Sequence, residues 1–206
     1  MSQLNKAIAI LEKGGIVIFP TETVLGIGCL LNFPESIERL YKIKKRDRTK
    51  PTLVLVKSLA DAQKLVKFSK TAEALAKHFW PGPLTISQPN AKNVPEQLLG
   101  PSRSLAIRIP SHTWLLSLLK ILGQPLLAPS ANFQNKPPAK KLAEIDKELA
   151  KLVDYEIDIE PGGNEPSTVV FVDNGGDYKI IREGPISKKA IEQVISVTEV
   201  KSGVKQ

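Results

Sequence analysis

Apolar residues near the start of the chain follow two different spacings. Leu4, Ala7, Ile8 and Leu11 lie three or four positions apart, which places them on one face of a helix. Residues 16–19 form an uninterrupted apolar run that stops at a proline, a pattern typical of a short buried strand. The N-terminal segment therefore predicts a helix followed by a strand.

The same two patterns alternate along the rest of the chain. Asn32, followed three positions later by Glu35, has the spacing of a capping box and predicts the start of a second helix. Capping residues and helical spacing predict further helices that begin at Ser58 and at Ser69 or Thr71, and others over residues 114–122, 143–152 and 187–197. Apolar runs predict strands at residues 53–56, 84–88, 105–109, 126–128, 168–172 and 179–181. Residues 89–102 show neither pattern and are expected to form a loop.

This order of elements predicts the fold class. Strands alternate with helices in the first half, whereas the two late strands flank residues 173–177, whose Asp-Asn-Gly-Gly-Asp sequence favours a hairpin. A mixed parallel and antiparallel sheet flanked by helices follows, in the α/β (α+β) class. The chain shows no internal repeat and no linker, so we expect one domain over residues 1–200 and a disordered tail at residues 201–206.

Composition narrows the class of protein. With 206 residues, 42% hydrophobic and 24% charged, the chain is typical of a globular protein that can bury a sizeable core. No apolar run approaches the roughly 18 residues of a membrane-spanning helix, and the N-terminus lacks the pattern of a secretion signal. We therefore expect a cytoplasmic protein that does not enter a membrane.

Cysteine, histidine and net charge restrict the chemistry. Cys29 is the only cysteine, and His78 and His112 are the only histidines, so no intrachain disulfide can form and no metal site is predicted. We expect Cys29 to be a small buried residue. The net charge of +8 favours anionic partners such as nucleotides or nucleic acid, without choosing between them.

The first candidate for chemistry follows the first predicted strand. Residues 19–28, Phe-Pro-Thr-Glu-Thr-Val-Leu-Gly-Ile-Gly, place two hydroxyls and a carboxylate between a strand end and two glycines. Such a loop can hold a small molecule, and the glycines would allow unusual dihedrals or a close approach to a ligand. The same residues also suit a helix N-cap, and the stretch alone leaves both interpretations open.

A basic segment, residues 42–50, follows the second predicted helix. Cations at a helix C-terminus are favoured by the helix dipole and stay solvated, which explains the segment without any ligand. Alternatively, Lys44 and Arg46 turn toward one ligand, because a fixed pair of cations suits a triphosphate whose charge builds on the leaving group.

Three further polar segments adjoin predicted strands. Residues 129–132 (Pro-Ser-Ala-Asn) follow a strand, residues 161–168 end in hydroxyls at a strand start, and Arg182 ends a strand. Open α/β sheets bind ligands at such ends, although local turns and a solvated arginine explain the same residues. The chain has neither a P-loop nor a dinucleotide-binding glycine motif. The residues themselves therefore predict only an anion-binding α/β protein.

In this order, the segments resemble the YrdC/TsaC family of L-threonylcarbamoyladenylate synthases. The matching motifs span residues 7–195 and are Pro20-Thr21-Glu22-Thr23 with Gly26 and Gly28, Lys44-x-Arg46, Trp80-Pro81-Gly82-Pro83-Leu84-Thr85, Arg108-Ile109-Pro110, Ser130-Ala131-Asn132, Pro166-Ser167-Thr168-Val169-Val170 and Arg182-Glu183-Gly184. Each motif is weak alone, whereas their joint order is specific. The resemblance implies a single YrdC-like domain with a twisted, open sheet and a large basic cavity.

The resemblance also implies a reaction. L-Threonine and bicarbonate or CO2 would give a carbamate that attacks the α-phosphorus of ATP, so that threonylcarbamoyl-AMP and pyrophosphate leave. Mg2+ would arrive with ATP, held by phosphate oxygens. A separate threonylcarbamoyl transferase complex would use the product to make N6-threonylcarbamoyladenosine at position 37 of tRNA.

The resemblance further assigns roles to individual residues. Those that match the family's phosphate and nucleotide clamp are Lys44, Arg46, Ser130 and Asn132, and Arg182 would contact the phosphate or ribose of the nucleotide. Those that would form or shape the threonine pocket are Thr21, Glu22, Thr23 and Ser167. Lys44 and Arg46 would be the catalytic pair, because alignment and charge neutralisation dominate phosphoryl chemistry.

Three positions depart from the family pattern. Leu25 stands where Tyr or Phe is common, Asp47 where the family usually has Pro, and Phe133-Gln134-Asn135 where Ser-Gly is frequent. These changes bear on pocket polarity, on the charge beside the clamp and on the shape of the nucleotide loop, and they allow a paralogue with another substrate. A second alternative is a module of the same fold that binds double-stranded RNA or tRNA and has no synthase activity. Its positive charge would be increased by Lys136, Lys140 and Lys141.

Overall fold

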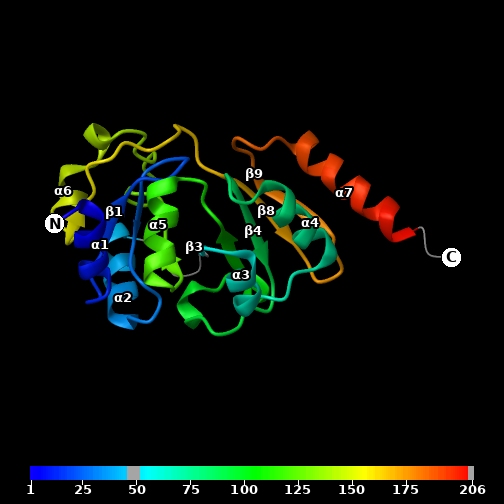
Figure 1. The fold of residues 1–206 in the computed structure, drawn as a ribbon, viewed down its shortest axis with the longest axis horizontal. Helices are drawn as coiled ribbons and strands as arrows, with labels where there is room; N and C mark the ends of the chain where they lie inside the picture. Colours follow the sequence, from blue (N-terminus) through cyan, green and yellow to red (C-terminus); the bar gives the residue numbers. More distant parts are fainter. Residues whose placement is uncertain (46–51, 204–206) are drawn as a thin grey trace.

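The computed structural model describes residues 1–45 and 52–203, with side chains described as far as residue 198. The molecule is elongated, and its N-terminus and C-terminal helix lie at opposite ends of the long axis (Figure 1). Helices α1, α2 and α5 gather toward the N-terminal end, and α4 and α7 pack together at the other (Figure 1).

Helices and short strands alternate through the first part of the chain, and a hairpin precedes the last helix. The helices are α1 (Gln3–Leu11), α2 (Pro34–Lys44), α3 (Leu59–Leu65), α4 (Lys70–Phe79), α5 (Thr113–Leu122), α6 (Lys147–Ala150) and α7 (Lys188–Gly203). The strands are β1 (Val17–Phe19), β2 (Gly26–Gly28), β3 (Leu53–Leu55), β4 (Leu84–Gln88), β5 (Leu105–Arg108), β6 (Leu126–Leu127), β7 (Tyr155–Glu156), β8 (Thr168–Val172) and β9 (Tyr178–Arg182). Short 3-10 turns lie at Glu96–Leu98, Pro101–Arg103 and Leu142–Glu144.

The strands form two sheets. The smaller has the order β2-β1-β7, with β1 antiparallel to β2 and parallel to β7. The larger has the order β6-β3-β5-β4-β8-β9, in which β3 with β5 and β4 with β8 are parallel and the other neighbours are antiparallel. Leu127 of β6 donates its N–H to the Cys29 carbonyl at 2.9 Å, just after β2, and so ties the two sheets together. The predicted mixed sheet is therefore confirmed.

Apolar side chains fill the space between the sheets and helices. Leu11, Phe19 and Leu118 are completely buried where α1 and α5 pack beside β1. At the other end of the molecule, Leu75 of α4 and Ile191 of α7 are completely buried in a cluster with β4 and β8. Because each fully buried side chain of this size stabilises the fold by roughly 1.5–3 kcal/mol, these clusters fix the positions of the strand ends that bear the polar loops.

Helix starts test the capping predictions. Ser58 and Ser69 are the N-caps of α3 and α4, as predicted, and the side chain of each accepts a backbone N–H three positions on. The predicted capping box at Asn32 is wrong, because α2 begins at Pro34 and its N-cap, Phe33, makes no side-chain capping bond. Proline in the first turn supplies a helical φ and lacks an N–H that would otherwise be unpaired.

Two later helices differ in extent from the prediction. Within residues 143–152 only Lys147–Ala150 is α-helical. Asp146 starts this short helix, because its carboxylate accepts the Glu148 N–H at 2.9 Å. Helix α7 continues to Gly203, past the expected end at residue 197 and the domain boundary placed at residue 200. Residues 204–206 lie outside the described residues, and the boundary and tail stay predictions.

Strand β2 is missing from the sequence-based prediction, which places Gly26 and Gly28 in a ligand-binding loop. Both glycines pair with β1 in the smaller sheet. A Cβ added to Gly28 would overlap the Leu127 carbonyl oxygen, and one added to Gly26 would lie 2.6 Å from the Phe19 ring. The two glycines therefore allow one part of the chain to approach another closely.

Candidate functional site

A cavity of about 590 Å³ lies where ends of strands from both sheets meet. Its walls come from the loop after β1, from β4 and β5, from the loop after β6, and from β8 and β9. The cavity is within the range of ligand pockets, which is roughly 300–1,000 Å³. Its polar and charged lining residues are Thr21, Thr23, Thr85, Ser87, Ser102, Ser104, Arg108, Ser130, Ser167 and Arg182.

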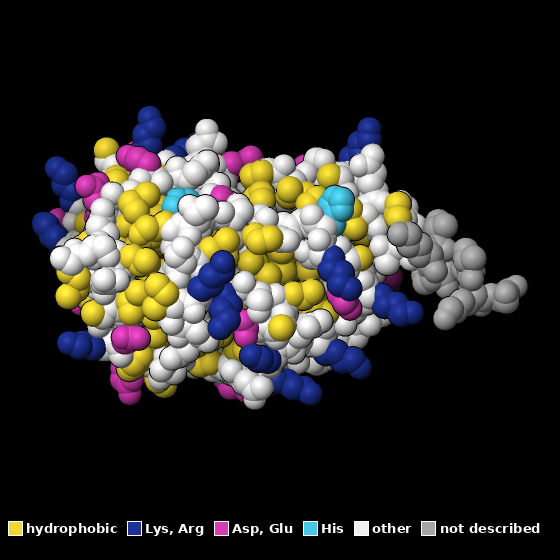
Figure 2. Space-filling model, in the orientation of Figure 1, with side chains coloured by type: hydrophobic (Ala, Val, Ile, Leu, Met, Phe, Trp, Pro, Cys, Tyr) yellow, Lys and Arg dark blue, Asp and Glu magenta, His cyan; other side chains and the backbone are white. Residues whose placement is uncertain are grey.

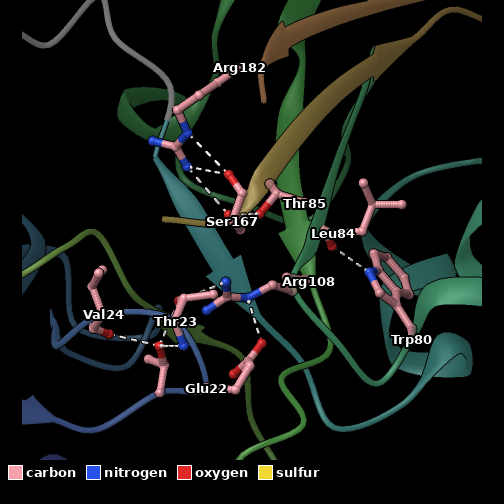
Figure 3. A network of polar contacts seen from close by, with 10 residues as sticks. Glu22, Thr23, Val24, Trp80, Leu84, Thr85, Arg108, Ser167 and Arg182 are labelled. Carbon is pink, nitrogen blue, oxygen red and sulfur yellow. Dashed lines mark hydrogen bonds and ion pairs between the residues drawn. The ribbon is translucent and has the colours of Figure 1, made fainter. Parts of the chain in front are cut away.

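The loop after β1 orients two hydroxyls at this cavity. Thr21 Oγ1 donates to the Val24 carbonyl at 2.7 Å. Because a hydroxyl carries one proton, Thr23 Oγ1 must donate in its 2.7 Å contact with Thr21 Oγ1. Arg108 Nη1 in turn donates to Thr23 Oγ1 at 3.2 Å (Figure 3). The helix N-cap interpretation of this loop does not hold, since the loop leads into strand β2.

Arg108, at the end of β5, is the most deeply buried charge in the cavity wall, with 2% of its surface exposed. Burial lowers the pKa of its guanidinium, while nearby Glu22 opposes that shift and Arg182 adds to it. The Glu22 carboxylate lies 3.6 Å from Arg108 Nε, and Glu22 itself is not among the lining residues. Arg108 is therefore a buried guanidinium whose nearest carboxylate, that of Glu22, lies outside the cavity lining.

A second arginine lines the cavity and is bonded differently. Arg182 at the end of β9 donates from Nε and Nη2 to the Ser167 carbonyl at 3.1 and 2.8 Å, and from Nη2 to Ser167 Oγ at 3.3 Å (Figure 3). Ser167 Oγ also contacts Thr85 Oγ1 at 2.8 Å. Arg182 thus fixes the loop before β8 and holds the Ser167 hydroxyl at the cavity.

Lys44 lies at the end of α2 and is 2% exposed. Its Nζ donates to the carbonyl oxygens of Ser130 and Asn132, at 2.5 Å each. The Ser130 hydroxyl donates to Asn132 Oδ1 at 2.5 Å, and Asn132 Nδ2 donates to the Lys136 carbonyl at 2.6 Å. Lys44 and Asn132 therefore brace the loop after β6, from which Ser130 reaches the cavity.

The structure gathers most of the predicted site residues. Those that line the cavity are Thr21, Thr23, Ser130, Ser167 and Arg182. Glu22, Lys44 and Asn132 stand behind the lining, and Arg46, like Asp47, lies outside the described residues. The roles assigned to all of them stay predictions.

Arg108 is the residue for which sequence reasoning proposed no role. Its motif, Arg108-Ile109-Pro110, contributed to the resemblance without an assigned chemistry. The available signal was a charged residue at the end of an otherwise apolar strand, followed by a proline. A buried charge is costly unless it is paired, so such a position indicates a ligand or an ion-pair partner.

Other chemistry is limited in the part of the chain that the structure describes. Cys29 is completely buried, and burial raises the pKa of its thiol to about 12, so it is a packing residue as expected. No group of three His, Cys, Asp or Glu side chains within residues 1–45 and 52–203 could hold a metal ion. No described helix is both long and apolar enough to cross a membrane.

A family model described as Sua5/YciO/YrdC, telomere recombination, matches residues 9–184. The chain belongs to the Sua5/YciO/YrdC family. This confirms the resemblance drawn from the motifs.

Two relatives in this family are named threonylcarbamoyl-AMP synthase. The protein from Pyrococcus abyssi is 30% identical over 207 residues, which cover 98% of this chain and 60% of the relative. The protein from Bacillus subtilis is 30% identical over 204 residues, which cover 98% of this chain and 59% of the relative. The chain therefore spans about 60% of the length of these relatives.

A solved structure shows the same fold. The crystal structure of P. abyssi Sua5 complexed with L-threonine superposes with a TM-score of 0.85 at 30% identity, over 93% of this chain and 57% of that one. The predicted YrdC-like fold is thereby confirmed.

Proposed function

We propose that this member of the Sua5/YciO/YrdC family is an L-threonylcarbamoyladenylate synthase. It would make threonylcarbamoyl-AMP and pyrophosphate from L-threonine, bicarbonate or CO2, and ATP. The observation that carries the proposal is the charge of the cavity: Arg108 and Arg182 both line it, and no described lining residue is acidic. Cations in a partly dry site favour an anion, and arginine binds carboxylates and phosphates in a forked geometry. The names of the relatives and the L-threonine of the P. abyssi complex support this choice of ligands.

We assign L-threonine to the end of the cavity at Arg108. The guanidinium suits the α-carboxylate of the amino acid. The Thr23 hydroxyl, whose proton is donated to Thr21, can accept a hydrogen bond from the amino group of the ligand. The Ser167 hydroxyl can form a hydrogen bond with the hydroxyl group of the ligand. Thr21 and Glu22 shape this end, because Thr21 orients Thr23 and Glu22 lies beside the arginine.

We assign the contacts with ATP to two lining residues, Ser130 in the loop after β6 and Arg182 at the end of β9. Lys44 and Asn132 would act on the nucleotide through the loop that they brace. For Lys44 to serve as a catalytic cation beside Arg46, its ammonium would exchange a carbonyl oxygen for a phosphate oxygen. We place Mg2+ on the ATP phosphates, since hard oxygen ligands suit it and the described residues offer no cluster of metal-ligating side chains.

The reaction needs alignment and charge compensation more than a nucleophilic side chain. The amine of threonine and bicarbonate would give a carbamate with loss of water. A carbamate oxygen would then form a bond to the α-phosphorus as the bond to pyrophosphate breaks. The product would pass to a separate threonylcarbamoyl transferase complex that modifies tRNA, a step that rests on the family resemblance.

The deciding experiment measures pyrophosphate release. Purified protein is incubated with ATP, Mg2+, bicarbonate and isotopically labelled L-threonine, with L-valine in place of threonine as a control. We expect pyrophosphate release that depends on threonine and on bicarbonate, together with a labelled nucleotide product. Pyrophosphate release that does not depend on threonine, or the absence of any release, would refute the proposed function.

Charge on the surface favours RNA binding as a second candidate function. Lysine and arginine side chains gather in the middle and right-hand part of the face seen in Figure 2, over the region of α3 and α4, and the net charge is +8. Binding of tRNA without any turnover, weakening steeply as salt rises, would support this candidate in place of the synthase.

A further inference from the structure

Glu22 occupies an unusual place beside the cavity. Its neighbours in sequence, Thr21 and Thr23, both line the cavity, but Glu22 does not. Its side chain is only 12% exposed, and its Oε1 lies 3.6 Å from Arg108 Nε (Figure 3). The carboxylate therefore stands next to the guanidinium, away from the space that a ligand would fill.

The atoms that face one another here are buried and unsatisfied. Both carboxylate oxygens of Glu22 and the Nε of Arg108 are shielded from solvent and have no hydrogen-bond partner among the described residues. Buried polar atoms are nearly always bonded, so exceptions call for an explanation. A buried carboxylate without hydrogen bonds lowers the free energy of unfolding, so a functional reason for its presence is favoured.

The guanidinium of Arg108 is held from two sides. Thr23 accepts a hydrogen bond from Nη1 at 3.2 Å, and Glu22 faces Nε at 3.6 Å. A guanidinium carries five N–H donors in one plane, so fixing two of its edges sets the direction of the remaining donors. Arg108 also lines the cavity, where those donors would meet a ligand.

We propose that Glu22 is a positioning residue that fixes the orientation of the Arg108 guanidinium and does not touch the ligand. The inference rests on the proposed function for its ligand, L-threonine, and adds how the carboxylate-binding arginine is held. Glu22 acts from behind: its charge keeps Nε turned toward itself, and the opposite edge of the guanidinium is presented to the cavity.

If Glu22 acted only through its charge, its removal would raise the affinity of the cavity for an anion, whereas loss of positioning would lower that affinity. Without the carboxylate, the cavity beside Arg108 and Arg182 would be more positive, and an anion would bind more tightly. Loss of positioning instead weakens binding, because the guanidinium no longer points where the carboxylate of the ligand lies. The sign of the change in affinity therefore separates the two roles.

The test uses Glu22→Gln, which keeps the shape of the side chain and removes its charge. We expect the dissociation constant for L-threonine, measured by calorimetry on the full chain, to rise about tenfold, with that for ATP changed less than about twofold. Glu148→Gln is the matched control: Glu148 is an exposed carboxylate paired with Lys151 at 2.7 Å, and its loss should leave both constants unchanged. Tighter or unchanged threonine binding by Glu22→Gln would overturn the proposal.

A double-mutant cycle shows whether Glu22 acts through Arg108. In an Arg108→Lys background the guanidinium is absent, so Glu22→Gln should change the threonine constant by much less than tenfold. An equal effect in both backgrounds would contradict positioning. Should Glu22→Gln fail to fold, Glu22→Asp replaces it; the shorter carboxylate is expected to give an intermediate loss of affinity.

A third measurement does not depend on the ligand. Hydrogen exchange of the Arg108 Nε–H, followed by nuclear magnetic resonance and assigned with Arg108→Lys, should be slow in the wild type and faster in Glu22→Gln. Equal exchange rates would overturn the proposal even if the protein binds threonine. If the wild type binds no threonine, the proposed function fails, and faster exchange in Glu22→Gln would still support the positioning of Arg108 by Glu22.

Discussion

Two arginines line the cavity, Arg108 and Arg182, and they are bonded in different ways. Arg182, on the edge strand β9, gives three hydrogen bonds to Ser167. Arg108, on the central strand β5, gives one to Thr23 and leaves its Nε without a hydrogen-bond partner among the described residues. The more deeply buried arginine is thus the less satisfied one.

This difference separates a residue that holds the cavity from one that is prepared for a ligand. Arg182 spends its donors on a backbone carbonyl, as Lys44 does on the loop after β6. Such bonds stabilise the shape of the walls, each by about 1.5–3 kcal/mol when one partner is charged. Arg108 lines the cavity with a single hydrogen bond, to Thr23, and an anionic ligand bound by its guanidinium would offset the cost of burying that charge.

The largest effect is expected from Arg108→Ala, which removes the arginine with unused donors. The kcat/KM for L-threonine should fall on the order of 100-fold, since a charge-assisted bond contributes about 3 kcal/mol. Threonine-dependent pyrophosphate release measures it. Arg39→Ala is the matched control, because Arg39 is a half-exposed arginine paired with Asp154 and is not among the residues that line the cavity. A kcat/KM within threefold of the wild-type value for Arg108→Ala would show that Arg108 is not the arginine that binds L-threonine.

A smaller effect is expected from Arg182→Lys, which keeps the positive charge and removes the forked N–H donors of the guanidinium. Lysine cannot reproduce the paired bonds to the Ser167 carbonyl, so the loop before β8 should loosen. We expect the free energy of unfolding in urea to fall by about 1 kcal/mol and kcat/KM to fall about tenfold. Unchanged stability together with a large loss of activity would show that Arg182 acts on ATP without stabilising the loop before β8.

The smallest effect concerns His112, whose buried Nδ1 has no partner among the described residues. Burial lowers the pKa of His112 from its ordinary value of 6.5, and nearby Glu22 opposes the shift. Because the unfolded chain then binds the proton more readily, this contribution to stability is complete above pH 6.5 and is lost as pH falls below it.

We therefore expect the free energy of unfolding to fall less in His112→Gln than in the wild type as the pH is lowered from 7 to 5. The two decreases should differ by less than about 1 kcal/mol. Urea unfolding at both pH values measures this difference, and His78→Gln is the control for a second histidine. Parallel pH profiles for wild type and His112→Gln would show that protonation of His112 does not account for the loss of stability in this pH range.

The sequence by itself determined most of the local elements and the family. Helical spacing and serine caps predict α3 and α4, and apolar runs predict β4 and β8, because these signals act within one element. The ordered motifs predict the family, which the family model confirms. Thr21, Thr23, Ser130, Ser167 and Arg182 could be selected in the same way, because polar residues at strand ends adjoin ligand sites in such folds.

Only the tertiary structure decided what each of these side chains faces. Gly28 lies against the Leu127 carbonyl, Lys44 against two carbonyls of a loop far along the chain, and Glu22 behind Arg108. These contacts join residues about 85 to 100 positions apart, so no local pattern encodes them. Sequence spacing indicates which residues share an element, whereas burial and charge pairing depend on how distant elements pack. Only the packed structure shows that Arg108, at the end of a strand, is a buried charge beside the cavity.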